Sequence, residues 1–252
     1  MLRHRVIPVV LINGYSVLKT IRFSERRNLG NPITVARTYN TRNVDELILL
    51  DIDASMQKRS IDMFTVREIA SECFMPLTVG GGLRSIEDIQ KLLKAGADKV
   101  SLNYGALVDP EFVRNAVRVF GAQCIVVSID IRRRDGVNRV WSRVDPALDL
   151  DPLEWIARAQ ALGAGELLIN FVDRDGTMEG CDQESIGGYA QAADVPLIAC
   201  GGISGPDDCV AAIRAGASAV AAASIFHFTN VTPNDCKRRM AEQGIPVRLL
   251  TP

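Results

Sequence analysis

An internal repeat constrains the fold of this chain more than any other feature. Gly81-Gly82 recurs 120 positions later as Gly201-Gly202, and Ala95–Ala97 recurs as Ala215–Ala217 at the same offset. The offset also relates single residues in neighbouring segments: Glu46 to Glu166, Asp53 to Asp173 and Val100 to Val220. Two similar halves, each with its own glycine-rich segment, indicate a duplicated structural unit.

Short apolar runs typical of buried parallel strands occur eight times. They span Val6–Ile12, Glu46–Ile52, Leu77–Val79, Lys99–Leu102, Cys124–Ile129, Glu166–Phe171, Pro196–Ala199 and Ala219–Ala222. A helical pattern follows each run, over Pro32–Asn40, Asp62–Cys73, Ile86–Ala95, Pro110–Phe120, Pro152–Leu162, Gln183–Ala192, Pro206–Ala215 and Pro233–Gln243. This alternation predicts an α/β fold, a single (β/α)8 TIM barrel with a two-fold internal repeat. We expect one domain, residues 1–252, with half-barrels of roughly 1–120 and 121–252, because no Pro/Gly/Ser-rich linker divides the chain.

Two connections are longer than the usual two to six residues of such loops. One runs from Asn13 to Asn31 and carries Lys19, and the other runs from Arg132 to Asp151 and carries Trp141. Both follow barrel strands, so both should rise from the C-terminal face, where barrel enzymes build their active sites. We expect them to cover a ligand.

Composition excludes several classes of function. A net charge of -1 argues against nucleic-acid binding, which needs a clustered positive excess. Six cysteines without a CxxC pair favour reduced thiols, and His4 and His227 are too few imidazoles for a multi-histidine metal site. No apolar run approaches the ~18 residues of a membrane span. We expect a cytoplasmic protein without a metal, a cofactor or a membrane segment.

The glycine-rich segments are candidate phosphate sites. Gly80–Gly82 and Gly201-Gly202 each precede a predicted helix start, where backbone N–H groups and the helix dipole favour an anion. Asp175–Thr177 and Ser224 add candidates to the second site. The alternative is that these glycines only form tight turns. Two copies favour an elongated ligand with a phosphate at each end.

Asp130 is the candidate acid–base residue, since it ends the fifth predicted strand at the same face. A structural role is the alternative. Its counterpart one repeat earlier is Leu11 or Val10, so the first half offers an apolar side chain where a second carboxylate would stand. Asp51 and Asp53 are the nearest remaining carboxylates of the first half.

The chain resembles HisF, the cyclase subunit of imidazole glycerol phosphate synthase, over essentially its whole length. The resemblance rests on segments along the chain: Arg5–Pro8, Asp45–Ser55, Leu77–Ser85, Ala95–Asn103, Gly121–Asp130, Leu162–Ile169, Asp173–Gly180 and Ala221–Phe228. It implies a barrel that partners a HisH-type glutaminase and receives ammonia through its interior. In that family the ammonia is used to cleave a bis-phosphorylated formimino-carboxamide ribonucleotide and to close an imidazole ring.

The resemblance also implies roles for single residues. Asp130 matches the general acid or base, and Lys19 matches a lysine of the first loop that closes over substrate. The implied phosphate ligands are Gly81, Gly82 and Asn103 at one site and Asp175, Gly176, Gly202, Ala223 and Ser224 at the other. An ionic ring at the ammonia entrance is matched by Arg5, Glu46, Lys99 and Glu166, and the glutaminase interface by Asp98 and Gln123. A ring that serves stability alone is the alternative.

The active face departs from the family pattern. Leu11 replaces the partner aspartate, Tyr104 replaces a threonine, and the segment from Ser142 lacks a glycine-rich basic loop. Intact channel residues with altered catalytic residues resemble HisF-like proteins associated with glycosyl amidation, where a separate amidotransferase acts on a sugar substrate. We therefore favour a HisF-like subunit that supports amidation of a phosphosugar-type substrate. The alternatives are a working cyclase, with Asp51 or Asp53 as the second carboxylate, and a non-catalytic ammonia conduit.

Overall fold

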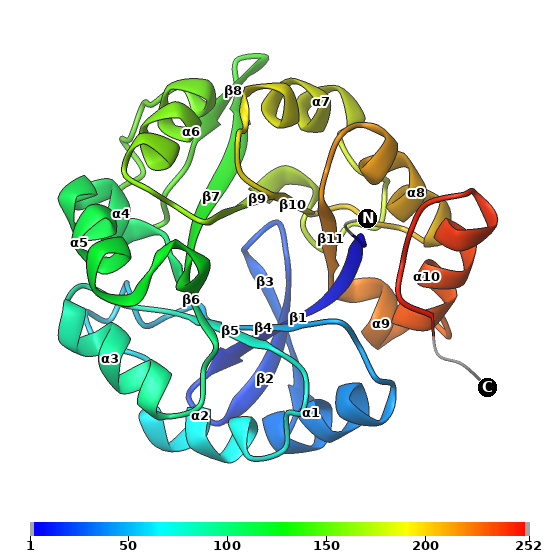
Figure 1. Ribbon diagram of the computed structural model, residues 1–252, viewed down its shortest axis with the longest axis horizontal. Coiled ribbons are helices and arrows are strands. Elements are labelled where there is room, and N and C mark those ends of the chain that lie inside the picture. The colour runs from blue at the N-terminus through cyan, green and yellow to red at the C-terminus, as the bar shows by residue number, and fades with distance from the viewer. Residues whose placement is uncertain (1–2, 250–252) are drawn as a thin grey trace.

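Eight parallel strands close into a barrel in the computed structural model, which describes residues 3–249. They are β1 (Arg5–Asn13), β4 (Leu47–Asp51), β5 (Leu77–Gly80), β6 (Lys99–Leu102), β7 (Ile125–Arg134), β9 (Glu166–Phe171), β10 (Leu197–Cys200) and β11 (Ala219–Ala222). Each strand pairs with the next in this order, and β11 pairs with β1 to close the ring (Figure 1). The predicted (β/α)8 TIM barrel is confirmed.

Helices surround the strands on all sides (Figure 1). The main ones are α1 (Pro32–Thr41), α2 (Met63–Ala70), α3 (Ile86–Lys94), α5 (Pro110–Phe120), α6 (Pro152–Ala161), α7 (Gln183–Ala192), α8 (Pro206–Arg214) and α10 (Pro233–Glu242). Their starts are set locally: Ser85 caps α3 in a capping box with Asp88, and Asp151 caps α6 just before Pro152. The short helices α4 (Tyr104–Val108) and α9 (Ser224–Phe228), and the 3-10 turns η1 (Ala122–Cys124) and η2 (Val172–Arg174), were not predicted.

The two long connections contain β-hairpins, which differs from the predicted loops. β2 (Ser16–Ile21) pairs with β1 and with β3 (Glu25–Gly30), and β8 (Val137–Val140) pairs with β7. β1 and β7 are the longest barrel strands, with 9 and 10 residues, so each projects beyond the barrel and exposes an edge that a returning strand can pair with. Asp135 and Gly136, both with positive φ, form the tight turn of the second hairpin.

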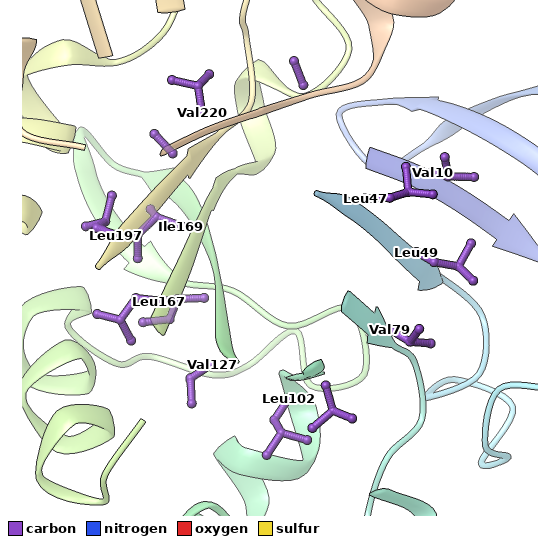
Figure 2. Packing of buried hydrophobic residues seen from close by; sticks show 14 of the residues in the cluster. Val10, Leu47, Leu49, Val79, Leu102, Val127, Leu167, Ile169, Leu197 and Val220 are labelled. Carbon is purple, nitrogen blue, oxygen red and sulfur yellow. The ribbon is translucent and has the colours of Figure 1, made fainter. Parts of the chain in front are cut away.

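The barrel strands divide their side chains between two cores, because successive residues of a strand point to opposite faces. Along β1, Ile7, Val9 and Leu11 belong to the inner cluster, while Val6 and Val10 belong to the outer one. The inner cluster also contains Ile48, Val126, Leu168, Ile198, Ala219 and Ala221. Figure 2 shows the outer cluster, including Val10, Leu49, Val127 and Leu197, on strands of both halves. Burial of this outer face holds the helices on the barrel.

Strand register decides which residue is the repeat counterpart of Asp130. Asp130 lies beside Asn170 in the β7–β9 pair, and Leu11 lies beside Leu50 in the β1–β4 pair. Because Leu50 and Asn170 are 120 positions apart, the counterpart is Leu11 rather than Val10. An aliphatic residue therefore occupies the first-half equivalent of the acid–base position.

Candidate functional site

A cavity opens at the C-terminal ends of the barrel strands, with about 1410 Å³ of space when its open mouth is included. Nine of the predicted catalytic and phosphate-binding residues line it: Asp130, Lys19, Gly81, Gly82, Asn103, Asp175, Gly202, Ala223 and Ser224. Gly176 lies beside this wall, where a Cβ would come within 2.2 Å of the Thr20 carbonyl oxygen. The barrel thus brings residues from both halves to one site.

Asp130 has the surroundings of a residue that exchanges protons. Its carboxylate is half-buried in the cavity wall and accepts a hydrogen bond from Asn103 Nδ2 at 3.0 Å. The pKa of Asp130 is raised to about 7, mainly by burial and also by the charge of Asp175, while hydrogen bonds from Asn103 and Asn170 act to lower it. A carboxyl group with such a pKa can accept or donate a proton near neutral pH.

The opposite wall offers no equivalent group. Leu11 lines the cavity and is 8% exposed, with Leu50 beside it on β4. Asp51 also lines the cavity, but Arg59 Nη1 lies 2.6 Å from its Oδ2, and its Oδ1 accepts the backbone N–H groups of Asp53 and Ala54, both at 3.1 Å. These contacts occupy both carboxylate oxygens of Asp51 and stabilise the turn after β4. Asp51 is therefore a poor substitute for the missing aspartate.

Lys19 does not face the cavity as a free cation. It is 3% exposed, and its Nζ lies 2.8 Å from Asp175 Oδ1 and 2.8 Å from the Thr20 carbonyl oxygen. Thr20 Oγ1 donates to the other carboxylate oxygen of Asp175 at 2.6 Å. Asp175, predicted as a phosphate ligand, thus anchors the first hairpin to the end of β9 in this conformation.

Both glycine turns need glycine for packing alone. Gly82 and Gly202 have φ values of +69° and +85°, and an added Cβ would lie 1.9 Å from the Arg59 carbonyl oxygen and 2.2 Å from that of Gly180. Glycine at these positions is therefore required with or without an anion. Independent support for a ligand comes from Ser224 Oγ and Asn170 Oδ1, buried atoms of the cavity wall that have no hydrogen-bond partner within the described chain. Buried polar atoms normally have partners.

Asp53 joins three segments at the mouth of the barrel, which sequence reasoning missed. Arg26 of β3 binds both carboxylate oxygens, at 2.6 and 2.7 Å, and Asn13 Nδ2 donates at 2.7 Å. Arg143, which follows β8, reaches Oδ1 at 3.3 Å. The hydrogen bond from Arg26 and the nearby positive charges lower the pKa of Asp53. Asp53 does not line the cavity and is saturated, which weighs against it as the second carboxylate of a cyclase.

The two hairpins also meet through aromatic side chains. Phe23, at the tip of the first hairpin, lies edge-to-face with Trp141, with ring centroids 5.7 Å apart. The Arg132 guanidinium lies 5.7 Å from the centre of the Trp141 ring. Phe23 and Trp141 line the cavity, and the first hairpin lies across the barrel opening in Figure 1. The long connections therefore cover the site, as the sequence predicted.

The opposite end of the barrel carries the four charged residues that the sequence placed together. Arg5 binds Glu46 at 2.5 Å and also pairs with Glu166, while Lys99 lies 3.2 Å from Glu46 and 3.0 Å from Glu166. Cations and carboxylates alternate, so each charge has two opposite neighbours. Burial lowers the pKa of Arg5, but the hydrogen bonds and charges of Glu166 and Glu46 outweigh burial and raise it.

The ring is only partly closed to solvent. The side chains of Arg5 and Lys99 are 24% and 21% exposed, against 2% for Glu46. Asp98 and Gln123 are exposed at the same end, beside the starts of β6 and β7. Ile7, Ile48, Val126, Ile198 and Ala219 form an inner apolar layer that does not reach the cavity wall. The barrel thus has a charged end, an apolar middle and an open cavity.

The His, Cys, Asp and Glu side chains of residues 3–249 form no group of three or more arranged to hold a metal ion. In the same range, no helix combines the length and the apolar character needed to cross a membrane.

The fold and the site define a (β/α)8 barrel that has a cavity with a carboxylate of raised pKa and two glycine turns at one end of its axis, and an ionic ring at the other end. A family model described as "Histidine biosynthesis protein" matches residues 5–232. A protein of Campylobacter jejuni subsp. jejuni serotype O:2, named "Putative imidazole glycerol phosphate synthase subunit hisF2", is 46% identical over 250 residues, which cover 99% of this chain and 100% of that protein. The chain belongs to the histidine biosynthesis protein family, and its HisF-like character is confirmed.

Proposed function

We propose that this chain is a HisF-like synthase subunit that receives ammonia from a HisH-type glutaminase and supports amidation of a phosphorylated sugar-type substrate. The observation that carries the proposal is that Leu11 lies opposite Asp130 in a cavity that is otherwise lined by glycine turns and polar side chains. Ring closure to an imidazole, in the family's mechanism, uses a pair of carboxylates. One carboxylate is enough to accept a proton from an attacking amine.

The ionic ring supports ammonia entry. Ammonia in water is mostly ammonium, and an ion loses much of its solvation in an apolar barrel, so transfer favours the neutral molecule. Glu46 and Glu166 can attract a cation to the partly exposed ring, while Arg5 and Lys99 oppose passage of its charge. The apolar layer beyond the ring then separates the incoming ammonia from solvent.

At the cavity, Asp130 and the polar wall would act on the incoming nitrogen. As ammonia adds to a carbon–oxygen double bond of the substrate, the π electron pair moves to the oxygen, and the nitrogen becomes positively charged and must lose a proton. The Asp130 carboxylate, with a pKa of about 7, can accept that proton, and Asn103 holds the carboxylate in place. Ser224 Oγ and Asn170 Oδ1 are available to bind polar groups of the substrate.

The second candidate is imidazole glycerol phosphate cyclisation itself, favoured by the printed name of the Campylobacter relative. Steady-state turnover of the formimino ribonucleotide with ammonium chloride separates the two. We expect the native chain to show no turnover above that of Asp130→Asn. Clear turnover that Asp130→Asn abolishes would instead establish the cyclase.

The glutaminase partner needs its own experiment. We expect the chain to form a complex with a HisH-type glutaminase and to increase glutamate release from glutamine, with Asp98→Lys weakening the complex. Glu111→Lys is the matched control, because it reverses an exposed charge on α5 that pairs with Arg114 away from the ring. Absence of both complex and stimulation would contradict ammonia transfer. Delivery of ammonia to an acceptor enzyme that Asp130→Asn leaves unchanged would indicate a conduit without catalysis.

A further inference from the structure

We infer that Arg143 is the cation of the first-half phosphate site, where its guanidinium binds a phosphate that also contacts Gly81-Gly82 and Asn103. This inference rests on the proposed function, since it assigns a residue to one end of the phosphorylated substrate. Arg143 lies in the segment after β8.

The first argument is position. The segment that carries Arg143 leaves the hairpin on β7, yet its guanidinium reaches Asp53 just after β4 at 3.3 Å. In the barrel, β5 and β6 lie between β7 and β4. Arg143 therefore spans the part of the mouth where β5 and β6 end, and it lines the same cavity wall as Gly81, Gly82 and Asn103.

The second argument is charge. The charged residues of the cavity wall are Lys19, Asp51, Asp130, Arg143 and Asp175. Lys19 is neutralised by Asp175 at 2.8 Å and is buried on the second-half side. Arg143 has a looser ion pair than Lys19, since its Nη1 lies 3.3 Å from Asp53 Oδ1, and its side chain is 40% exposed.

The third argument is unused bonding capacity. A guanidinium has five N–H donors, and Arg143 uses one of them in the hydrogen bonds of residues 3–249. Asp53 does not depend on Arg143, because it already accepts hydrogen bonds from both Nη atoms of Arg26 and from the side-chain amide of Asn13. Arg143 can therefore turn toward an anion while Asp53 keeps its other partners. A planar fork that binds two oxygens suits a phosphate monoester.

The geometry also fits the altered first-half site. Tyr104 lines the cavity where the family resemblance expects a threonine, so a small hydroxyl donor is missing next to Asn103. The guanidinium of Arg143, on the same cavity wall, compensates for that donor. Selectivity at this end should consequently depend on charge, and affinity should fall with added salt.

A phosphate titration followed by backbone amide chemical shifts tests the inference site by site. Inorganic phosphate is added to the native chain, and the amides of Gly81 and Gly82 report the first site while those of Gly201 and Gly202 report the second. In Arg143→Gln we expect the first pair to need about tenfold more phosphate for half-saturation, because a charge-assisted hydrogen bond is lost. The second pair should titrate as in the native chain.

Two variants and salt sharpen the result. Arg143→Lys keeps the charge without the fork and should lie between native and Arg143→Gln. Arg133→Gln is the matched control, because it removes an exposed arginine of the same hairpin that does not line the cavity. Raising ionic strength should narrow the difference between native and Arg143→Gln. Urea denaturation of each variant checks that the fold is kept.

The outcomes separate the inference from the function on which it rests. Equal half-saturation of the Gly81-Gly82 pair in native and Arg143→Gln overturns the role of Arg143. The role of Arg143 is also overturned if, in the native chain, phosphate changes the amide chemical shifts of Gly201 and Gly202 but not those of Gly81 and Gly82. A native chain in which neither pair responds overturns the proposed phosphorylated substrate as well.

Discussion

The two halves of the barrel share a scaffold but differ in the chemistry they carry. Gly82 and Gly202 occupy matching turns, each with positive φ and each against a carbonyl oxygen of a neighbouring loop. At the matching positions of the first strand of each half, however, β7 has Asp130 and β1 has Leu11. The turns are kept by packing requirements within the chain, which apply equally to both halves. A carboxylate at the strand end is not subject to this packing requirement, and the second half has Asp130 where the first half has Leu11.

The cation distribution reverses this asymmetry. Arg5 and Lys99, both from the first half, supply the ring, while each half contributes one carboxylate, Glu46 and its repeat mate Glu166. The first half therefore supplies both cations of the ring, and the second half supplies Asp130 at the cavity. Four comparisons between the halves test this division.

The largest effect is expected at the glycine turns. Gly82→Ala and Gly202→Ala should each lower the free energy of unfolding by about 3 kcal/mol or more, because the new Cβ meets a carbonyl oxygen at positive φ. Gly188→Ala, in α7 with nothing within 4 Å of the added Cβ, is the control and should change it by less than about 1 kcal/mol. Urea denaturation measures all three. If the alanine substitution is tolerated at one turn and not at the other, the two halves differ in packing as well as in chemistry.

Next come the two ring carboxylates. Glu46→Gln should cost about 2 kcal/mol of stability and Glu166→Gln about 1 kcal/mol, with the usual cost of breaking a buried pair reduced because both cations are partly exposed. Glu46 should matter more, since it is less exposed and also accepts a hydrogen bond from Thr78 at 2.7 Å. Glu72→Gln, which breaks an exposed pair with Arg37, should change stability by less than about 0.5 kcal/mol. A larger loss of stability in Glu166→Gln than in Glu46→Gln would contradict this ranking.

Leu11→Asp breaks the chemical asymmetry directly. It places a carboxylate opposite Asp130, so we expect turnover of the formimino ribonucleotide with ammonium chloride to rise at least about tenfold over the native chain. Leu11→Asn, of the same shape without the acid, is the control and should show no rise. Equal turnover in all three chains would show that more than the second carboxylate separates this site from a working cyclase.

The smallest effect is the pH dependence of stability due to Asp130. Its pKa is about 7 in the folded chain, against an ordinary value of 3.8, so between these values the folded chain holds a proton that the unfolded chain has released. Stability should therefore fall as pH rises from about 4 to 7 and then level off. Asp130→Asn removes this slope, so it should be more stable than the native chain at pH 8, on the order of 1 kcal/mol, and no more stable at pH 4.

Denaturation of both chains across this pH range provides the measurement. Leu11→Asn serves as a control for a polar substitution without a titrating group, and its stability difference from the native chain should be the same at pH 4 and pH 8. A stability difference between Asp130→Asn and the native chain that is the same at pH 4 and pH 8 would contradict the raised pKa.

Much of the candidate site could be predicted from sequence because a (β/α)8 barrel brings its strand ends together. Once eight strands were recognised, Asp130, Asn103 and the glycines had to meet at one face, and the structure places them in one cavity. The role of Asp175 could not be predicted in this way. Its contacts with Lys19 and Thr20 depend on a hairpin whose strand pairing is set by tertiary packing.

By itself, the sequence determined the barrel, its duplication and the missing carboxylate, because each follows from periodicity or from residue identity at a repeat position. The charged ring followed from the resemblance to the HisF family. Only the tertiary structure decided that Leu11 is the counterpart of Asp130, since strand register is a property of paired strands. It also decided that Arg26 and Arg143 both donate hydrogen bonds to Asp53. These arginines lie far apart in the chain, and no local pattern specifies a contact that depends on how two hairpins fold over one opening.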